Sequence, residues 1–312
     1  MGKRKKGNPV SGWIVIDKAI GMNSTPAVGK VRWLFNAQKA GHGGTLDPLA
    51  SGLLPIALGE ATKTVSLIMD GSKSYDFTVK WGEATNSDDS QGEVTDTSDL
   101  RPSAEQIDAI LDDYMGEIWQ RPPSVSAIKV DGQRAYDLAR KGDAQVLEER
   151  QVWIEDLQLI EAREHDADFR VDCGKGTYVR SLAPDFGEQL GCLGHITALR
   201  RTKVGPFDEA DAISLDKLEE IDNIAVRFEQ LLPLETALDD IPALDVTQAE
   251  AQTMRNGQSI SLLKKSDLHR LPVLDEEDPR LWVRLDGTAV ALAVFEAGMV
   301  RSLRVINQAD VS

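Results

Sequence analysis

The sequence predicts an α+β fold, made of a large mixed-sheet domain and a small, mostly β domain near the C-terminal end. Segments with strand alternation and segments with helical spacing follow one another without the regular alternation of a doubly wound sheet. Two prolines and several acids in LLPLETALDDIPALDV (231–246) separate the periodic segments. We therefore expect a basic disordered tail over 1–10, a larger domain over 11–235 and a smaller one over 243–312.

The first part of the chain indicates a strand, a helix, a loop and more helix. GWIVIDKAIG (12–21) is expected to be a strand that ends in a glycine turn. STPAVGKVRWLFN (24–36) begins with Ser or Thr as a cap, has Pro26 in its first turn and carries apolar residues at helical spacing. After a glycine-rich loop, SGLLPIALGEATKTVSLIMDG (51–71) is expected to form two short helical pieces broken at Gly59.

The middle of the chain mixes strands with a capped helix. KSYDFTVKWGEATNSDDSQGEVTDT (73–97) alternates as a strand and turns into a second one. SAEQIDAILDDYMG places Ser103 and Gln106 in capping-box positions and predicts an amphipathic helix. Further strands are expected at 151–160 and 167–173.

Glycines mark the ends of the later helices. The segment 120–142 indicates a proline-rich lead, a short strand, a DG turn and a helix that ends at Gly142. TYVRSLAPDFGEQLG predicts a helix closed by Gly191, followed by a strand in HITALRRTKVGPF. Beyond the boundary we expect a helix that ends at Gly257 and then three short strands over 280–307, joined by DG and AG turns.

Composition narrows the possible classes of protein. No apolar run approaches the roughly 20 residues that span a bilayer, and the basic start lacks the apolar segment of a secretory signal. Only Cys173 and Cys192 are present, without the spacing of a zinc site. This cysteine usage is typical of a reduced compartment, so we expect a cytoplasmic protein without membrane contact.

The net charge of −16 is unevenly distributed. Residues 1–42 carry eight Lys/Arg against one acid, whereas residues 208–278 carry eighteen acids against six bases. Charges farther apart than about 8 Å are largely screened at physiological salt. A basic face can therefore bind phosphates while an acidic region lies elsewhere, although most of the negative charge is explained by a solvated surface.

One segment, GHGGTLDPLASGLLPIALGEATK (41–63), asks for a chemical explanation. It is rich in glycine but contains no phosphate-binding loop and no cysteine, and Asp47 lies near its middle, five residues after His42. The glycines before Asp47 and Pro48 after it restrict the backbone while leaving space above the carboxylate. From local sequence alone, a turn aspartate and a nucleophile both remain open.

This segment closely resembles the GxLDPxAxG signature of bacterial tRNA pseudouridine-55 synthases. Four further stretches agree with that family in kind and order: IDKAIGMNS (16–24), KSYDF (73–77), CGKGTYVRSL (173–182) and ITALRRTKVGPF (196–207). The resemblance covers roughly 12–235, with a weaker match of 243–306 to the family's PUA-like terminal domain. Ile16 stands where the family usually has Leu. Ala19 and Gly43 stand where it usually has Pro and often Thr, which affects loop rigidity rather than the nucleophile.

The resemblance implies an isomerase that detaches the uracil of tRNA uridine 55 at N1 and reattaches it through C5, without a cofactor or a metal. Asp47 would be the nucleophile, attacking either the sugar C1′ or the base C6. Arg180 would grip its carboxylate with two hydrogen bonds and keep it ionised. Tyr75 would stack on the flipped base, and its hydroxyl could move a proton during the rearrangement.

The resemblance also implies supporting roles. Tyr178 and Leu199 correspond to the family's other pocket-lining positions. His42 would support the RNA loop, and Lys18 the loop that carries Asp47. Ten basic residues are candidates for phosphate contacts: Lys3, Arg4, Lys5, Lys6, Lys30, Arg32, Lys39, Arg200, Arg201 and Lys203.

The expected partner is the T arm of tRNA, recognised by the shape of its folded loop. We expect a monomer, because a single tRNA needs only one site. Two other classes of function remain open at this point. A tRNA-binding folding helper would be favoured by a missing nucleophile, but Asp47 is present. A nucleoside hydrolase that shares the loop would leave the basic segments unexplained.

Overall fold

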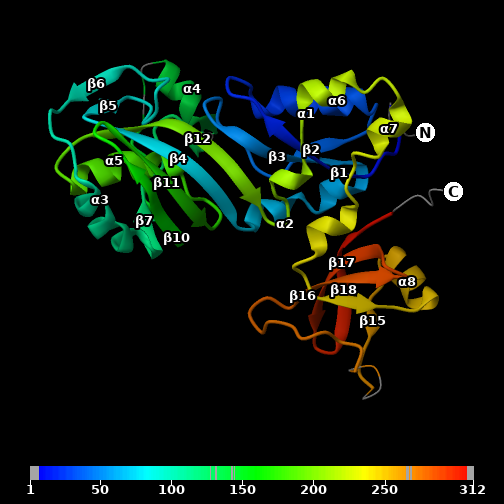
Figure 1. Ribbon diagram of the computed structural model, residues 1–312. Helices are drawn as coiled ribbons and strands as arrows, with labels where there is room; N and C mark the ends of the chain where they lie inside the picture. The colour runs from blue at the N-terminus through cyan, green and yellow to red at the C-terminus, as the bar shows by residue number, and fades with distance from the viewer. Residues whose placement is uncertain are drawn as a thin grey trace.

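The computed structural model describes residues 7–126, 128–130, 132–141, 143, 145–264, 267 and 269–307. In this part of the chain, nine strands form one mixed sheet, to which helices and a separate strand-rich domain are attached (Figure 1). Along the sheet the strands are β13 (Ala212–Ser214), β1 (Gly12–Lys18), β3 (Ser51–Leu58), β12 (Gly194–Val204), β4 (Lys73–Trp81), β11 (Asp166–Cys173), β10 (Arg150–Ala162) and β7 (Gly116–Gln120), with β2 (Ala40–His42) paired to β3. The predicted α+β class is confirmed.

Strand β3 corrects the prediction of helix over 51–58. Its eight residues SGLLPIAL pair antiparallel with β1 and parallel with β12, and all but the first are buried. An apolar run that is buried on both faces has no periodicity that separates a strand from a helix. Gly52 is required here, because a Cβ at its φ of +96° would lie 2.2 Å from the carbonyl oxygen of Arg201. Only the piece after Gly59 is helical, as the short α2 (Val65–Asp70).

Three helices, α1 (Ser24–Leu34), α3 (Ala104–Leu111) and α5 (Val179–Gln189), share one core with the sheet. The capping box of α3, with Ser103 and Gln106, is confirmed. The expected cap of α1 is wrong: Asn23 occupies the N-cap and makes no side-chain cap bond. The hydroxyl of Ser24 instead exchanges two 2.9 Å hydrogen bonds with the backbone of Leu46. Helix α1 is thereby tied to the loop that carries Asp47.

The remaining elements are short. They are β5 (Glu83–Thr85), β6 (Val94–Thr97), β8 (Lys129–Val130), β9 (Gln133–Arg134), α4 (Ala135–Arg140), α6 (Leu215–Glu220) and α7 (Ile224–Phe228), with 3₁₀ turns at Gly59–Lys63, Asp112–Tyr114, Glu209–Asp211 and Leu234–Leu238. The helix predicted over 120–142 is present, and two short strands, β8 and β9, stand where one was predicted, whereas Asp131 of the predicted DG turn and Gly142 lie outside the described residues. No described helix has the length and apolarity needed to cross a membrane.

The C-terminal domain is a separate five-stranded sheet with one helix, which confirms the predicted strand-rich module. Its strand order is β14 (Ala243–Asp245), β16 (Arg280–Leu285), β17 (Thr288–Glu296), β18 (Met299–Val305) and β15 (Ile260–Ser261), and α8 (Gln248–Arg255) packs on it. Helix α8 is followed by Gly257 at φ +76°. The predicted turn at Asp286 and Gly287 has positive φ at both residues, as a tight hairpin requires.

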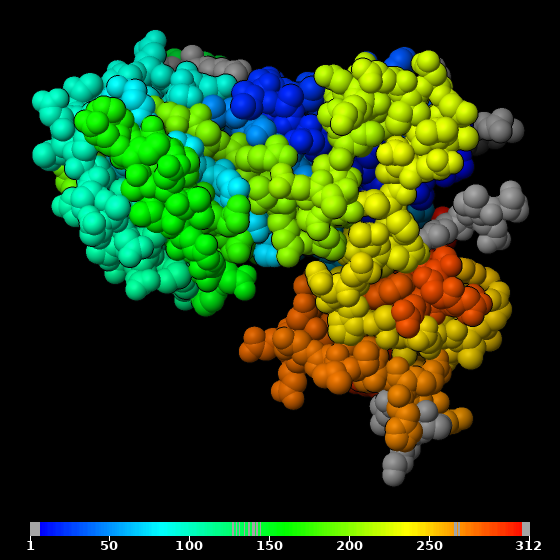
Figure 2. Space-filling view, in the orientation of Figure 1, coloured from blue at the N-terminus to red at the C-terminus, as the bar shows by residue number. Residues whose placement is uncertain are grey.

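This domain forms a lobe beside the larger domain (Figure 2). Trp282, Ala289 and Ile306 share a core cluster with Trp13 and Phe207 of the larger domain. Two polar contacts join the signature segment to the end of the chain. The Nζ of Lys63 donates to the carbonyl oxygen of Val305 at 2.7 Å, and the backbone N–H of Asn307 donates to Glu60 at 2.7 Å.

The structure shortens the predicted N-terminal tail. Residues 1–6 lie outside the described residues, but Asn8 exchanges backbone hydrogen bonds with Asn36 and Gln38, and Val10 is buried. The packed fold therefore begins before residue 11. The boundary at 235–243 remains a prediction, and the 3₁₀ turn Leu234–Leu238 packs in the cluster that joins the two domains.

Candidate active site

Asp47 lies in the loop between β2 and β3, and its side chain is 36% exposed. The loop is held from two sides. Ser24 bonds the backbone of Leu46, as described above, and Arg201 on β12 donates to the carbonyl oxygens of Gly44 at 3.0 Å and Leu53 at 2.8 Å. Arg201 is 1% exposed. The backbone around Asp47 is thus positioned by groups from a helix and a central strand.

Arg180, in the first turn of α5, pairs with Asp47 at 2.8 Å between Nε and Oδ2. Its other nitrogens donate to the carbonyl oxygens of Ser87 and Val125, both at 2.9 Å. The expected two-bond grip on the carboxylate is therefore wrong, because backbone carbonyls engage the rest of the guanidinium. Asp89 stands 3.6 Å from Nη1 and shares this charge. Oδ1 of Asp47 makes no described hydrogen bond within the described part of the chain.

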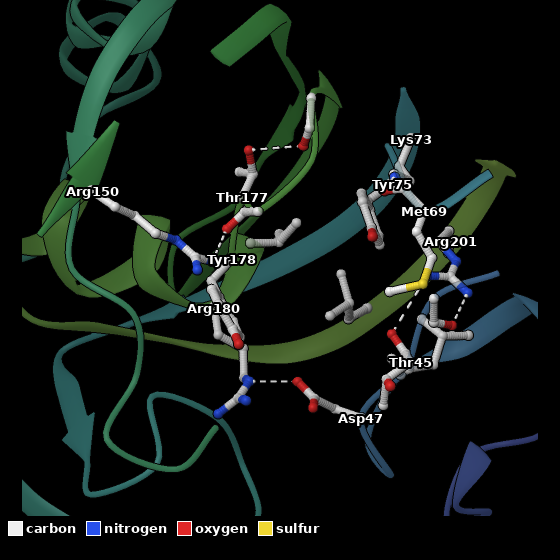
Figure 3. Close-up of a pocket in the computed structure, with 17 residues that line it drawn as sticks. Thr45, Asp47, Met69, Lys73, Tyr75, Arg150, Thr177, Tyr178, Arg180 and Arg201 are labelled. Carbon is white, nitrogen blue, oxygen red and sulfur yellow. Dashed lines mark hydrogen bonds and ion pairs between the residues drawn. The ribbon is translucent and has the colours of Figure 1, made fainter. Parts of the chain in front are cut away.

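The carboxylate opens into a cavity of about 300 Å³. Tyr75, Tyr178 and Leu199 line it, so the structure brings together the residues predicted from four separate motifs. Figure 3 shows Asp47 and Arg180 at one end of the cavity, with Tyr75 and Tyr178 on either side. Burial raises the pKa of the Tyr75 phenol, with the nearby Arg201 opposing the shift. Tyr75 is therefore a neutral hydroxyl at physiological pH.

Cations dominate the lining of this cavity. Its side chains include four cations, Lys73, Arg150, Arg180 and Arg201, and one carboxylate, Asp47. Lys73 donates to the carbonyl oxygens of Met69 and Gly71, and burial lowers its pKa to about 8. Neither Lys73 nor Arg150 was assigned a role from the sequence. The lysine of KSYDF was available as a signal, whereas nothing around Arg150 marked it.

Lys18 and His42 lie outside the cavity lining. The side chain of Lys18 is fully buried, and its Nζ donates to the carbonyl oxygens of Ala19 at 3.0 Å and Met22 at 2.9 Å. Burial lowers its pKa to about 8, and Asp47 partly offsets the shift. For His42, burial and then Arg201 lower the pKa, while Nδ1 accepts from the backbone N–H of Gly44 at 3.3 Å. His42 thus contacts the loop that carries Asp47, whereas Lys18 holds the turn between β1 and α1. The roles predicted for both residues stay predictions.

Four of the six described candidates for phosphate contacts have partners within the protein. Arg201 is buried, Arg200 pairs with Asp17 and Glu209, and Lys30 pairs with Glu219. Arg200 and Arg201 are adjacent on one strand and therefore lie on opposite faces of the sheet, in different surroundings. Arg32 donates to the carbonyl oxygen of Ala37. Lys3, Arg4, Lys5 and Lys6 lie outside the described residues, and Lys39 and Lys203 stay candidates.

Among the described residues, no group of three or more His, Cys, Asp or Glu side chains is arranged to hold a metal ion. Both cysteines are buried free thiols. Burial raises the pKa of the Cys173 thiol to about 11, which keeps it protonated and inert as a nucleophile.

Known proteins resemble the chain in sequence and in fold. Residues 32–179 match the TruB family pseudouridylate synthase (N terminal domain), and residues 180–239 match the tRNA pseudouridylate synthase B C-terminal domain. A "tRNA pseudouridine synthase B" of Rhodospirillum rubrum is 49% identical over 308 residues, covering 98% of this chain and 100% of the relative. A protein of the same name from Bradyrhizobium diazoefficiens is 51% identical over 318 residues, covering 98% and 90%.

The fold is similar to solved structures. The one described as "Crystal Structure of a Cbf5-Nop10-Gar1 Complex" superposes with a TM-score of 0.74 at 25% identity, covering 95% of this chain and 85% of that chain. A structure of an H/ACA RNP bound to a substrate RNA containing 2'-deoxyuridine gives a TM-score of 0.72 at 22% identity, covering 99% and 92%.

Proposed function

This chain belongs to the TruB family of pseudouridylate synthases, and from that membership we propose that it converts uridine 55 in the T loop of tRNA to pseudouridine, with Asp47 as the nucleophile. The observation that carries the assignment of Asp47 is its geometry. It is the one carboxylate among the described residues that line the cavity, it is held by Arg180 through a single oxygen, and its other oxygen is open to a ligand.

The reaction needs an ionised carboxylate in a cavity that can take the uracil base. The bond between N1 and C1′ breaks, C5 joins C1′, the hydrogen on C5 leaves as a proton and N1 gains one. No oxidant or water is consumed, so the protein must supply a nucleophile and a route for the proton. Arg180 is 4% exposed, and its Nε donates to Oδ2 of Asp47 at 2.8 Å. Attack at C1′ and attack at C6 both use the same free oxygen.

Tyr75 is the proposed platform for the flipped base and a carrier of its proton. Turning a base out of its stack costs a few kcal/mol, and stacking on an aromatic ring returns about 1–3 kcal/mol. The neutral phenol can donate one hydrogen bond and accept another, so it can relay a proton by giving up its own as it takes up the one from the base. Tyr178 and Leu199 complete the walls of the cavity.

The proposed partner is the T arm of tRNA, bound by a monomer in the cytoplasm. Three more cations than carboxylates line the cavity, which suits a polyanionic substrate despite the acidic chain. Lys39 and Lys203 extend the candidate contacts to phosphates.

Release of tritium from C5 of uridine tests the proposed function, with an unmodified tRNA transcript and no added cofactor or metal. We expect release from the wild-type protein, and none when cytidine replaces the target uridine. Asp47→Asn should lower turnover on the order of 10⁴-fold or more, as loss of a nucleophile does, while tRNA affinity stays within a few fold. Asp76→Asn is the matched control, because Asp76 follows Tyr75 but pairs with Arg170 on the other face of the sheet. Normal turnover by Asp47→Asn would contradict the assignment.

A further inference from the structure

We infer that Arg150 is a further substrate-positioning residue of this site: its guanidinium fixes the ring of Tyr178 and binds a phosphate that flanks the target uridine. This inference rests on the proposed function, because that function supplies the polynucleotide substrate.

Arg150 begins β10 at the rim of the cavity. Its Cζ lies 5.1 Å from the centroid of the Tyr178 ring, and Nη2 donates to the carbonyl oxygen of Gly176. Figure 3 shows this side chain reaching from one wall toward Thr177 and Tyr178. A guanidinium over an aromatic face is attracted by the ring's π electrons. One side chain therefore contacts both ends of the turn that leads into α5.

The same turn is also held by a residue of β7. Gln120 pairs with Arg150 across the β7–β10 ladder, and its Oε1 accepts from the backbone N–H of Tyr178 at 2.7 Å. Gly176 has φ +89°, and a Cβ there would lie 3.6 Å from the Arg150 guanidinium. The turn is thus closely packed under Arg150. The position of the Arg150 guanidinium therefore determines the position of the Tyr178 ring, which forms one wall of the cavity.

Arg150 differs from the other three cations of the cavity in its partners. Arg180 pairs with Asp47, while Lys73 and Arg201 are buried and donate to backbone carbonyl oxygens. Across the described residues no carboxylate lies within 4.0 Å of the Arg150 guanidinium, although its neighbour Glu149 pairs with Arg121. One of the five N–H donors is used by Gly176, which leaves donors available at the rim.

A phosphodiester is the anion that fits these free donors. Each nucleotide that enters the cavity brings a phosphate on both sides of its sugar, and these phosphates remain at the rim while the base goes in. The planar fork of arginine matches a phosphate with two hydrogen bonds. Binding a phosphate while covering Tyr178 would fix the backbone of the target nucleotide relative to the wall that its base contacts.

Three variants of the full chain test this inference: Arg150→Gln, Arg150→Lys and, as matched control, Arg121→Gln. Arg121 is a neighbouring arginine that pairs with Glu149 and does not line the cavity. The ligand is an unmodified T-arm stem-loop RNA, or the same RNA with a neutral methylphosphonate at the linkage 5′ or 3′ of the target uridine. Affinity is measured as a function of salt, and turnover is measured as kcat and KM.

We expect one of the two methylphosphonates to weaken binding to the wild type about 10-fold, as loss of one charge-assisted contact does, and to have no further effect on Arg150→Gln. The slope of log affinity against log salt should fall by about 0.7–0.9 in Arg150→Gln, the share of one phosphate, and stay unchanged in Arg121→Gln. Arg150→Lys should keep the salt slope but lose kcat, because an ammonium is not a planar cover for Tyr178.

If each methylphosphonate weakened binding to the wild type and to Arg150→Gln by the same factor, the phosphate contact would be overturned. A wild-type kcat for Arg150→Lys would overturn the role toward Tyr178. If the wild type itself forms no pseudouridine, the proposed function fails, while the binding comparison with the methylphosphonate RNAs still decides whether Arg150 holds a phosphate.

Discussion

The site of the large sheet and the surface of the C-terminal sheet satisfy their cations in opposite ways. In the C-terminal domain each of four arginines pairs with a carboxylate in a partly exposed position: Arg270 with Glu250, Arg280 with Asp278, Arg284 with Asp245 and Arg301 with Glu296. At the cavity, Lys73 and Arg201 are buried and donate to backbone carbonyl oxygens, as does Lys18, which lies outside the cavity lining. A carbonyl oxygen accepts a hydrogen bond without cancelling the charge of the donor. A carboxylate accepts the hydrogen bond and also cancels the charge.

This difference explains how an acidic chain can present a positive cavity. Among the described residues, Arg150 and Arg201 donate to backbone carbonyl oxygens and pair with no carboxylate, so their charge is not cancelled, whereas Arg180 pairs with Asp47. In the C-terminal domain, four carboxylates neutralise the arginines beside them, and most of the other described carboxylates are exposed to solvent. Since screening confines such fields to about 8 Å, the net charge of −16 and a cavity for a polyanion are compatible.

The largest effect on stability is expected from removing a buried cation, with Arg201→Met. The substitution would leave the carbonyl oxygens of Gly44 and Leu53 without a donor, at about 1–3 kcal/mol each. We expect the free energy of unfolding to fall by about 4 kcal/mol and turnover to fall about 100-fold, because the loop carrying Asp47 loses its support. Chemical denaturation and tritium release measure the two effects.

Arg200→Met is the matched control on the same strand. Arg200 is 36% exposed and pairs with Asp17 and Glu209, so its loss should cost less than about 1 kcal/mol. Equal losses of stability in the two variants would remove the distinction between carbonyl-held and carboxylate-paired cations.

The second prediction concerns pH and Lys18. Its pKa is about 8 in the folded protein, below the ordinary value of 10.5, so the unfolded chain binds more protons between those values. The free energy of unfolding contributed by Lys18 should therefore rise by about 3 kcal/mol as the pH increases from 8 to 10.5, and stay constant below that range. Lys18→Met should lack this rise. Chemical denaturation of both proteins across this pH range measures the difference. Parallel curves of unfolding free energy against pH would show that folding does not lower the pKa of Lys18.

The smallest effect is expected at the C-terminal surface, with Arg284→Gln. The arginine is 37% exposed and its partner Asp245 is 70% exposed, so the pair is well solvated. We expect a change in the free energy of unfolding below about 0.5 kcal/mol and no change in turnover. A loss of several kcal/mol on denaturation would mean that surface pairs and buried cations contribute alike.

Much of the fold followed from local patterns. The capping box of α3 and the hairpin turn at Asp286 were predicted because each is specified by residues within a few positions of one another. Strand β3 was not, because an apolar run carries no period once both of its faces are buried. The cap of α1 was misassigned for a similar reason, since Ser24 bonds Leu46, which is distant in sequence.

The site likewise has features that local motifs predict and features that depend on contacts between distant segments. Asp47, Tyr75 and Arg180 were named from motifs, and the structure brings them to one cavity although 133 residues separate Asp47 from Arg180. The number of bonds between them was wrong, because the carbonyl oxygens of Ser87 and Val125 compete for the guanidinium. Arg150 was missed, because its position over Tyr178 comes from strand pairing and from no local signal.

Motifs and periodicity in the chain predict the class of fold, the family and several residues that line the cavity, because they are properties of neighbouring residues. The folded structure was needed to learn which cations are buried, which oxygens accept their hydrogen bonds and which donors remain open at the cavity. Those properties depend on desolvation and on contacts between distant segments. Arg200 and Arg201 are adjacent and identical in type, yet the two faces of one strand give them opposite environments.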